Sequence, residues 1–539
     1  MKKTIYSIIL FLSATVLYCY SQINIPLEKD ERWYGGSVNE GHKMPFENGY
    51  QNSLVNYIQG NQAAPLLLSN KGRFIWSEEP FSFLLSDNQL IIHTTGEIDI
   101  QKKGTTLKDA FYAAAEKHFP TLGKLPDTLL FTSPQYNTWI ELIYNQNQQD
   151  ILKYAHDIIN NGYPPGVLMI DDNWAPYYGK FEFRKDRFPD AKTMVSELHS
   201  LGFKVMLWVC PFISPDTEVF RELFQKKLLL MSNEGNINLE WKDATIPALT
   251  NWWNGYSAVL DFSNPEAVKW YQEQLEFITR EYGFDGFKLD AGDPEFYSHN
   301  IISYVRSTTA NDHCELYGLF GLKYPLNEYR AMWKRGGEPL VERLRDKYHT
   351  WEDLQKLIPH ITTASLLGYS FTCPDMIGGG DYSSFIDNKK LDQELIVRSA
   401  QCHALMPMMQ FSVAPWRILD KKHHDAVKDA VRLRNSFVPE IMKLAEAAAQ
   451  EGLPIVRNME YEFPNQGFEE CKDQFMLGED ILVAPMLTKG NGRKVVFPKG
   501  TWLDENGKKY QGGKTIEFEV ALTKILWFRK KDSDIKFNQ

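Results

Sequence analysis

Acidic residues stand at the ends of several short apolar runs that are typical of buried strands. Asp171 and Asp172 follow one such run, Asp290 follows another, and Asp375 follows a third. Carboxylates that meet at one edge of a sheet can act as acid, base or nucleophile, and cleavage of a glycosidic bond needs two of them. Acids at strand ends also cap helices and bind metals, so position alone leaves those interpretations open.

The elements that must position these acids alternate between strands and helices from about residue 126 to residue 450. The apolar spacing predicts helices at 149–161 and 189–200, a helix that begins at Pro265, and strands at 166–170, 203–209 and 286–289. Asn264 is a capping residue before Pro265, and Gly283 ends that helix. Repeated strand–helix units indicate a parallel sheet, and the length suits a (β/α)₈ barrel with insertions. A doubly wound open sheet is the alternative, disfavoured because no GxGxxG follows a strand.

Strand-like texture flanks this region on both sides. Short strands such as 90–93 separated by turn signals predict a β-sandwich at 22–125. After a helix at about 426–451, runs at 475–484, 494–497 and 515–528 predict a small β domain at 451–539. The expected fold is therefore α/β: a (β/α)₈ TIM barrel at 126–450, flanked by an N-terminal β-sandwich and a small C-terminal β domain.

The first 21 residues have the pattern of a signal peptide. Lys2 and Lys3 precede an apolar run, and Cys19 and Ser21 fit cleavage after Ser21. We expect a secreted or periplasmic protein with no membrane span after removal of this segment. An N-terminal membrane anchor is the alternative, and a lipoprotein anchor at Cys19 is disfavoured by the bulky Tyr18.

Composition narrows the classes of partner. The net charge of −10, without a long basic run, argues against nucleic acid binding. The 14 Trp and 26 Tyr residues would suit stacking on sugar rings. Five cysteines remain after cleavage without CxxC spacing, which favours buried free thiols over a disulfide framework. Since the histidines also lack metal-ligand spacing, we expect no metal.

The chain resembles glycoside hydrolase family 31 from about residue 30 to its end. Within that family it is most similar to the branch of the myogenesis-regulating glycosidase and bacterial α-galactosidases. The resemblance rests on the order of these segments: WYGG at 33–36, IDDNW at 170–174, LWVCPF at 207–212, GFKLDAGD at 286–293, LGYSF at 367–371, PDMIGG at 374–379, MPMMQFS at 406–412 and LGEDILVAP at 477–485.

The resemblance implies that Asp290 is the catalytic nucleophile. Its place at the end of a strand agrees with that role. Lys288 lies two residues earlier, and by the period of two its side chain points the same way. A cation there would keep Asp290 ionised and could reach a sugar hydroxyl. The alternative is that Lys288 is only a buried ion-pair partner.

The resemblance places the acid/base on the loop after the sixth strand, within 343–351, and we assign it to Asp346. Its neighbours depart from the pattern of the branch, and a solvated charge cluster with Arg345 and Lys347 is the alternative reading. Asp353 and Asp375 are the rivals. Protonation at neutral pH would require a raised pKa of Asp346, from apolar burial or from repulsion by Asp290.

The remaining site residues should bind sugar. We expect Asp172, supported by Asp171, to accept hydrogen bonds from hydroxyls. Trp139, Trp208 and Trp253 are candidate stacking walls, with core packing as the alternative for each. Two arginines complete the predicted set: Arg343, which matches an arginine near the acid/base of the family, and the weaker candidate Arg330.

These features predict an exo-acting retaining α-galactosidase that acts on an oligosaccharide or glycoside and needs no cofactor. The galactose assignment rests on KLDAGD and DDNW, because relatives acting on other sugars usually carry Met-Asn-Glu or Phe-Gly-Glu after the nucleophile. α-Glucosidase, α-xylosidase and α-N-acetylgalactosaminidase are alternatives, as is a transglycosylase. A sugar-binding protein without catalysis is the alternative from another class, and the oligomeric state is left open.

Overall fold

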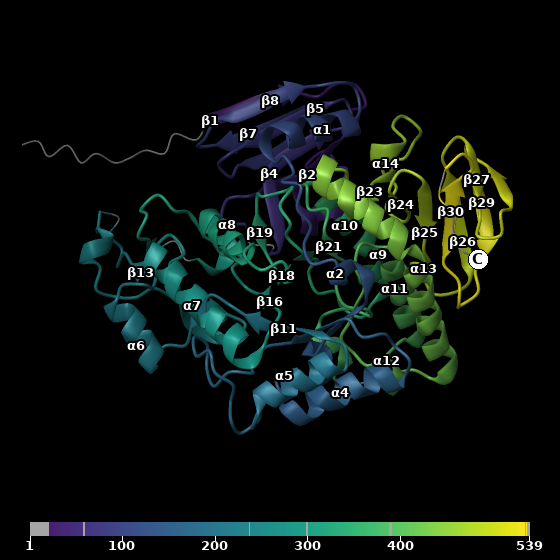
Figure 1. Cartoon of the computed structure of the whole chain (residues 1–539). Helices are drawn as coiled ribbons and strands as arrows, with labels where there is room; N and C mark the ends of the chain where they lie inside the picture. Colours follow the sequence, from purple (N-terminus) through teal and green to yellow (C-terminus); the bar gives the residue numbers. More distant parts are fainter. Residues whose placement is uncertain are drawn as a thin grey trace, which may run out of the picture.

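The computed structural model describes residues 21–533 and 535, apart from 58–59, 237, 298–299 and 388–390. At its centre lies an eight-stranded sheet in the order β21-β20-β18-β16-β11-β10-β9-β22, in which neighbouring strands pair in parallel. A parallel bridge between Met376 and Gln410 joins the two ends of this sheet and closes it into a barrel. Figure 1 shows the barrel between an N-terminal sheet region above it and a C-terminal sheet region to its right. The expected (β/α)₈ architecture with two β flanks is confirmed.

The barrel strands are short and differ in how extensively they pair. Their bounds are β9 Gln135–Asn137, β10 Val167–Ile170, β11 Lys204–Val209, β16 Gly286–Leu289, β18 Asn327–Tyr329, β20 Glu342–Arg343, β21 Thr372–Cys373 and β22 Gln410–Phe411. On one side, β10 with β11 and β11 with β16 are in register over four residue pairs each. On the other side, β18 meets β20 at one pair and β20 meets β21 at two. The acids that follow β10, β16 and β21 lie at the same edge because the strands are parallel.

Helices cover the outside of the barrel. Their bounds are α4 Gln148–Asn160, α5 Ala191–Ser200, α7 Pro265–Tyr282, α8 Ala310–Gly321, α10 Leu357–Leu366, α11 Gln393–Ala404 and α13 Lys421–Glu451. The predicted ends of α7 are confirmed: the Asn264 side chain accepts from the Glu266 amide, and Gly283 ends the helix with φ of 87°. The last helix was predicted to begin near residue 426. It begins five residues before that position, at Lys421, because Asp420 caps it.

The N-terminal region consists of two sheets and a helix. One sheet has the order β1-β7-β6-β3, and the other has the order β19-β4-β5-β8 with β2 paired to β4. The bounds are β1 Ser21–Pro26, β2 Trp33–Ser37, β3 Gln51–Ser53, β4 Gln62–Ser69, β5 Arg73–Ser77, β6 Ser82–Ser86, β7 Gln89–Thr94, β8 Ile98–Lys102 and β19 Met332–Trp333. Helix α1, Leu107–His118, was not predicted within the sandwich; a Thr106–Asp109 capping box starts it. Residues 1–20 of the predicted signal segment, 1–21, lie outside the described residues, and Ser21 is the first residue of β1.

A short 3₁₀ segment ties this region to the barrel. The segment η1, Val38–Lys43, follows β2 and packs against α10. Gly41 makes the close approach feasible, because a Cβ there would lie 2.4 Å from the Pro359 carbonyl oxygen. The N-terminal region therefore reaches the part of the barrel from which the loop after β20 departs.

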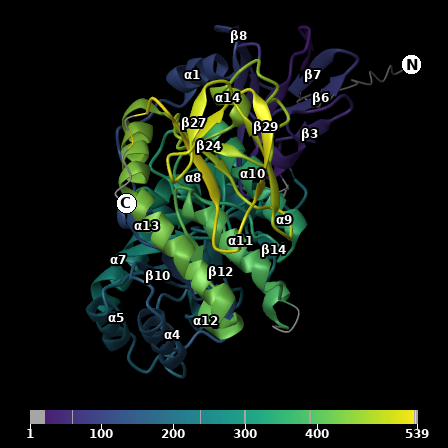
Figure 2. The same cartoon turned by 90° about the vertical axis from the view of Figure 1, so that its right-hand side faces the viewer.

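The C-terminal region contains a six-stranded sheet and a two-stranded sheet, which lie in front of α13 in Figure 2. The bounds are β23 Val456–Arg457, β24 Phe475–Leu477, β25 Ile481–Ala484, β26 Gly492–Phe497, β27 Thr501–Leu503, β28 Lys509–Gln511, β29 Lys514–Glu519 and β30 Leu526–Lys530. The run at 475–484 is a hairpin rather than one strand, because the chain turns at Gly478 with φ of 62°. The run at 515–528 likewise divides between β29 and β30, which belong to different sheets.

Two expectations from composition concern thiols and membranes. The cysteines of the described chain are free, and four of the five are buried; Cys471 is half-buried. Among the residues that the structure describes, no helix has the length and apolar character needed to cross a bilayer.

Candidate active site

One cavity of about 270 Å³ opens at the carboxyl edge of the barrel strands. All ten site residues predicted from the sequence line it: Trp139, Asp171, Asp172, Trp208, Trp253, Lys288, Asp290, Arg330, Arg343 and Asp346. They lie on or just after six different barrel strands, with one more from an inserted hairpin, so the closed barrel is what brings them together. Their individual roles stay predictions.

Asp290 follows β16 at the floor of this cavity and is 7% exposed. Its Oδ2 accepts a hydrogen bond of 2.6 Å from the indole Nε1 of Trp208 on the neighbouring strand. Its Oδ1 accepts from the amide of Ala291 at 2.9 Å. Burial disfavours ionisation of Asp290, but the charges of Lys288 and the nearby arginines and the Trp208 bond outweigh it, so its pKa is lowered. Asp290 is thus held as a carboxylate.

Lys288 connects Asp290 to the acids that follow β10. Its Nζ lies 2.7 Å from Oδ2 of Asp171, and both side chains are buried. Its charge is the largest of the influences that lower the pKa of Asp290, so the electrostatic effect expected from the sequence is present. Its direct ion-pair partner is Asp171, and any contact with a sugar hydroxyl stays a prediction.

Asp346 lies on the loop after β20, where its carboxylate forms an ion pair with Arg343. Burial would raise the pKa of Asp346, but Arg343, Arg330 and Lys288 outweigh burial and lower it to about 2. The expectation of a raised pKa for Asp346 is therefore wrong. The reason is that three cations from three strands converge on this carboxylate, which the local sequence does not reveal.

The pKa of a second carboxyl, that of Asp375, is shifted in the opposite direction. Arg343 Nη1 also contacts Asp375 Oδ1 at 3.1 Å, so one guanidinium bridges the two acids. Asp375 Oδ2 accepts from the amides of Lys347 at 2.8 Å and Gly380 at 3.1 Å. Burial and repulsion by Asp346 raise the pKa of Asp375 to about 7. Asp346 and Asp375 therefore titrate as a pair that keeps one proton near neutral pH.

The geometry separates Asp346 from its two rivals. Asp375 is fully buried, and it is absent from the described lining of the catalytic cavity. Asp353 lies in the first turn of the short helix α9, Trp351–Gln355, which Thr350 caps, and its carboxylate lies 2.7 Å from Lys356. It lines a neighbouring cavity instead. Among the three acids, Asp346 is the one that faces the space beside Asp290.

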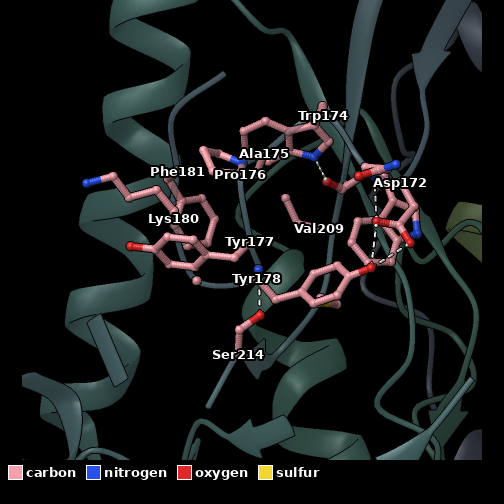
Figure 3. Close-up of a pocket in the computed structure, with 14 residues that line it drawn as sticks. Asp172, Trp174, Ala175, Pro176, Tyr177, Tyr178, Lys180, Phe181, Val209 and Ser214 are labelled. Carbon is pink, nitrogen blue, oxygen red and sulfur yellow. Dashed lines mark hydrogen bonds between the residues drawn. The ribbon is translucent and has the colours of Figure 1, made fainter. Parts of the chain in front are cut away.

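The carboxylate of Asp172 is held by hydrogen bonds from Tyr178 and Asn254. Its carboxylate accepts from the hydroxyl of Tyr178 at 3.0 and 3.2 Å and from Asn254 Nδ2 at 2.9 Å. Burial and repulsion by Asp171 raise its pKa to about 7, against these bonds. Figure 3 shows Tyr178 pointing at Asp172 from the loop 174–181, which encloses a second small cavity behind it. Asp172 can therefore donate as well as accept a hydrogen bond at neutral pH.

Aromatic side chains form the rim of the cavity. Trp139 lies edge-to-face against Tyr144 and Tyr382, with centroids 5.3 and 5.5 Å apart. Trp253 is 43% exposed, and the Arg330 guanidinium lies 4.9 Å from its ring centre. Such exposed rings are suited to stacking on a sugar. Trp208, by contrast, is buried and holds Asp290.

Several lining residues were missed by sequence reasoning. They are Tyr144, Met376, Gly380, Asp381 and Tyr382, together with Asn254 behind the lining. Asn254 sits at the turn between β14 Leu249–Trp252 and β15 Gly255–Val259, a hairpin inserted after β11. The PDMIGG segment next to Gly380 was a usable signal. The residues of the hairpin and of the loop have no such signal in the sequence, because only tertiary packing brings them to the barrel mouth.

Chemically, the site offers one carboxylate held ionised and a second within a proton-retaining pair. These are the two groups that nucleophilic displacement with proton donation requires.

Sequence comparison gives the chain two matches to described domains. Residues 133–444 match the profile "Glycosyl hydrolases family 31 TIM-barrel domain", and residues 452–535 match "Glycosyl hydrolase family 31 C-terminal domain". The myogenesis-regulating glycosidase of Mus musculus is 31% identical over 76% of this chain and 58% of its own length. α-Glucosidase 2 of Bacillus thermoamyloliquefaciens is 26% identical over 72% of this chain and 51% of its own. The chain thus spans only part of these relatives.

Solved structures share the fold across nearly the whole chain. A GH31 dextranase of Flavobacterium johnsoniae in complex with glucose superposes with a TM-score of 0.83, at 20% identity, covering 95% of this chain and 66% of its own. A GH31 α-xylosidase from a soil metagenome, in complex with xylose, has a TM-score of 0.80 at 21% identity, covering 95% of this chain and 79% of its own.

Proposed function

The chain belongs to glycoside hydrolase family 31, and from that membership we propose that it is an exo-acting retaining α-glycosidase. The observation that carries the proposal is the ionised, Trp208-bound carboxylate of Asp290 across one cavity from Asp346. The cavity of about 270 Å³ lies at the small end of ligand pockets, which suits a single terminal sugar.

The proposed reaction has two displacements. In the first, an oxygen of Asp290 attacks the anomeric carbon while the Asp346 carboxylic acid protonates the departing glycosidic oxygen, which gives a β-linked glycosyl-enzyme. In the second, Asp346 takes a proton from water, and the hydroxide attacks the same carbon and frees Asp290. Two inversions return the α configuration.

The polar surroundings divide the two roles. Lys288 and the Trp208 indole favour the charged form of Asp290, which keeps it nucleophilic. Asp346 obtains its proton within the pair that it forms with Asp375 through Arg343. When Asp290 becomes an ester it loses its negative charge. The net charge around Arg330 and Arg343 is therefore more positive in the second step than in the first.

We further propose that the terminal sugar is α-galactose. KLDAGD at 288–293 and DDNW at 171–174 support this, and Asp172 with its raised pKa is suited to bind the axial 4-hydroxyl. The curated relatives named above include a glucosidase, so specificity must be measured. A site that pairs with a hydroxyl discriminates against the epimer that leaves its buried atoms unpaired.

The test is kcat/KM on nitrophenyl α-galactoside, α-glucoside, α-xyloside and α-N-acetylgalactosaminide. We expect galactose to be preferred by roughly 100-fold, the scale of one or two lost buried hydrogen bonds. Asp290→Asn should abolish turnover on any of them while the unfolding transition is kept. A preference for glucoside or xyloside overturns the sugar assignment alone. Activity on none, with an intact fold, favours a sugar-binding protein without catalysis.

We also propose export of the chain, on the signal-like pattern of residues 1–21. Expression of the full sequence in a Gram-negative host should place the protein in the periplasm or medium, with a mature mass that corresponds to cleavage after Ser21. An intact mass in the cytoplasm would refute it.

A further inference from the structure

A second cavity, of about 530 Å³, adjoins the catalytic one. The two share Arg330, Asp346 and Asp381 in their linings. The second cavity lies between the loop after β20, the segment η1 and the start of α10. In the proposed function Asp346 protonates the departing oxygen, so a leaving group at that oxygen extends past Asp346 toward this cavity. The inference that follows rests on that function.

Four basic side chains, Arg330, Arg345, Lys347 and Lys356, line this cavity beside four carboxylates, although the whole chain carries a net charge of −10. His360 in its wall is buried and lies 3.1 Å from His42. Burial holds the pKa of His360 well below its usual range, and all the charged groups that add to this effect are cations: Lys347, Lys356 and Arg345, besides His42. Cations therefore act on His360, while the carboxylate of Glu40 acts on His42.

The carboxylates of the wall already have protein partners. Glu40 lies 2.6 Å from Lys43 and accepts from the Tyr50 hydroxyl at 2.8 Å. Asp353 lies 2.7 Å from Lys356 and accepts from the amide of Tyr348 at 2.7 Å. These acids are satisfied within the protein, so they do not require a cationic ligand.

Lys347 is different. It is only 6% exposed, and its Nζ donates to the carbonyl oxygen of Arg345 at 2.6 Å. Within the described part of the chain, no carboxylate oxygen lies within 4.0 Å of Nζ to form an ion pair. Burial lowers its pKa to about 8, in spite of Asp375, Asp353 and Asp346. A buried ammonium group whose acceptor is a neutral carbonyl gains from an anion supplied by a ligand.

We propose that this cavity binds the leaving-group sugar and that this sugar carries an anionic group, a carboxylate or a sulfate, which pairs with Lys347. The substrate is then an acidic oligosaccharide with a neutral terminal sugar. The terminal sugar occupies the cavity at Asp290, and the acidic unit lies on the far side of Asp346. Arg345 belongs to the same wall, where Lys356 is already paired with Asp353.

The test uses whichever nitrophenyl α-glycoside the enzyme cleaves and measures its inhibition by three methyl glycosides: methyl β-glucuronide, methyl β-glucoside 6-sulfate and methyl β-glucoside. We expect at least one anionic glycoside to inhibit about tenfold more strongly than the neutral one, and the stronger anion identifies the natural group. Lys347→Met should remove this preference. The control Lys204→Met should keep this preference, because Lys204 begins β11 at the edge of the barrel opposite the catalytic cavity.

Calorimetric binding of the same glycosides to the Asp290→Asn protein keeps the test independent of turnover and of the folding of the Lys347 variant. Added salt should weaken the anionic ligands and leave the neutral one unchanged. Equal binding of all three glycosides, or a preference that survives Lys347→Met, overturns the inference and leaves the glycosidase proposal standing. Failure to cleave any nitrophenyl glycoside would instead count against the proposed function.

Discussion

The indole nitrogen of Trp208 donates a 2.6 Å hydrogen bond to Oδ2 of Asp290, across two neighbouring strands of the barrel. Trp208 is in register with Lys288, two residues before Asp290, so the strand pairing fixes where the indole points. A charge-assisted bond of this length favours the ionised acceptor. The residue expected from the sequence to stack on sugar is instead the one that orients the nucleophile.

Trp208→Phe should raise the pKa of Asp290, because the bond to its charged form is lost while burial remains. As pH falls, the Asp290 carboxylate is then protonated at a higher pH than in the wild type. The acidic limb of kcat/KM should therefore move up by about one pH unit, with kcat roughly 10-fold lower or more. The measurement is a pH profile on an activated substrate. Trp270→Phe, on the outer helix α7, is the control and should leave the profile in place. An unshifted acidic limb in Trp208→Phe would contradict the assigned effect of the bond.

Asp346→Ala should lower kcat/KM by about 10³-fold for a disaccharide but much less for a nitrophenyl or fluoride leaving group, which needs little protonation. Azide should accelerate the second step and yield a glycosyl azide, because a small anion needs no base. The comparison across leaving groups is the measurement. If Asp353→Ala shows this pattern and Asp346→Ala does not, the acid/base assignment is wrong.

Asp375→Asn should move the basic limb of the pH profile to lower pH. In the wild type the pair loses its last proton near the raised pKa of Asp375, about 7. Without the partner carboxyl, Asp346 is left beside Arg343 and Arg330, which lower its pKa, so its acid form is lost earlier as pH rises. A disaccharide substrate should reveal the change most clearly. An unchanged basic limb, with an unchanged unfolding transition, would show that the two acids do not share the proton.

Asn254→Ala should weaken sugar recognition rather than chemistry. Asn254 donates to Asp172 at 2.9 Å and to the Tyr178 hydroxyl at 2.7 Å, and it accepts from Tyr144 at 2.9 Å. Loss of these bonds leaves Asp172 poorly oriented, so KM should rise about 10-fold and discrimination between sugars should narrow. Asn251→Ala, on an exposed position of the same hairpin, is the control. A fall in kcat with the sugar preference intact would refute this role.

Much of the fold was predictable because its signals are local. The capping at Asn264, the stop at Gly283 and the acid after each short apolar run all lie within a few residues of the element they define. Errors arose where a local signal was overlooked, as at Asp420, or where one apolar run serves two strands, as at 475–484. In that run only Gly478 marks the turn.

The pKa shifts in the site were less predictable from the sequence than the identity of the residues that form it. The set of residues followed from strand ends and from the family resemblance. The direction of the Asp346 shift did not, since it depends on Arg330, Arg343 and Lys288, which reach it from separate strands. Asn254 and Tyr382 escaped notice because they come from an inserted hairpin and a loop, whose places are fixed by packing alone.

The closure of the barrel through the Met376–Gln410 bridge has a consequence for its slow fluctuations. The amide of Ile377 donates to the Gln410 carbonyl at 2.8 Å beside this bridge, whereas the amide of Asp290 donates to the Val209 carbonyl at 2.9 Å beside a four-pair ladder. Less pairing must break to open the first, so its deuterium exchange should be the faster. The barrel would then open locally near Asp346 and Asp375, while the pairing of β16, which carries the nucleophile, stays intact.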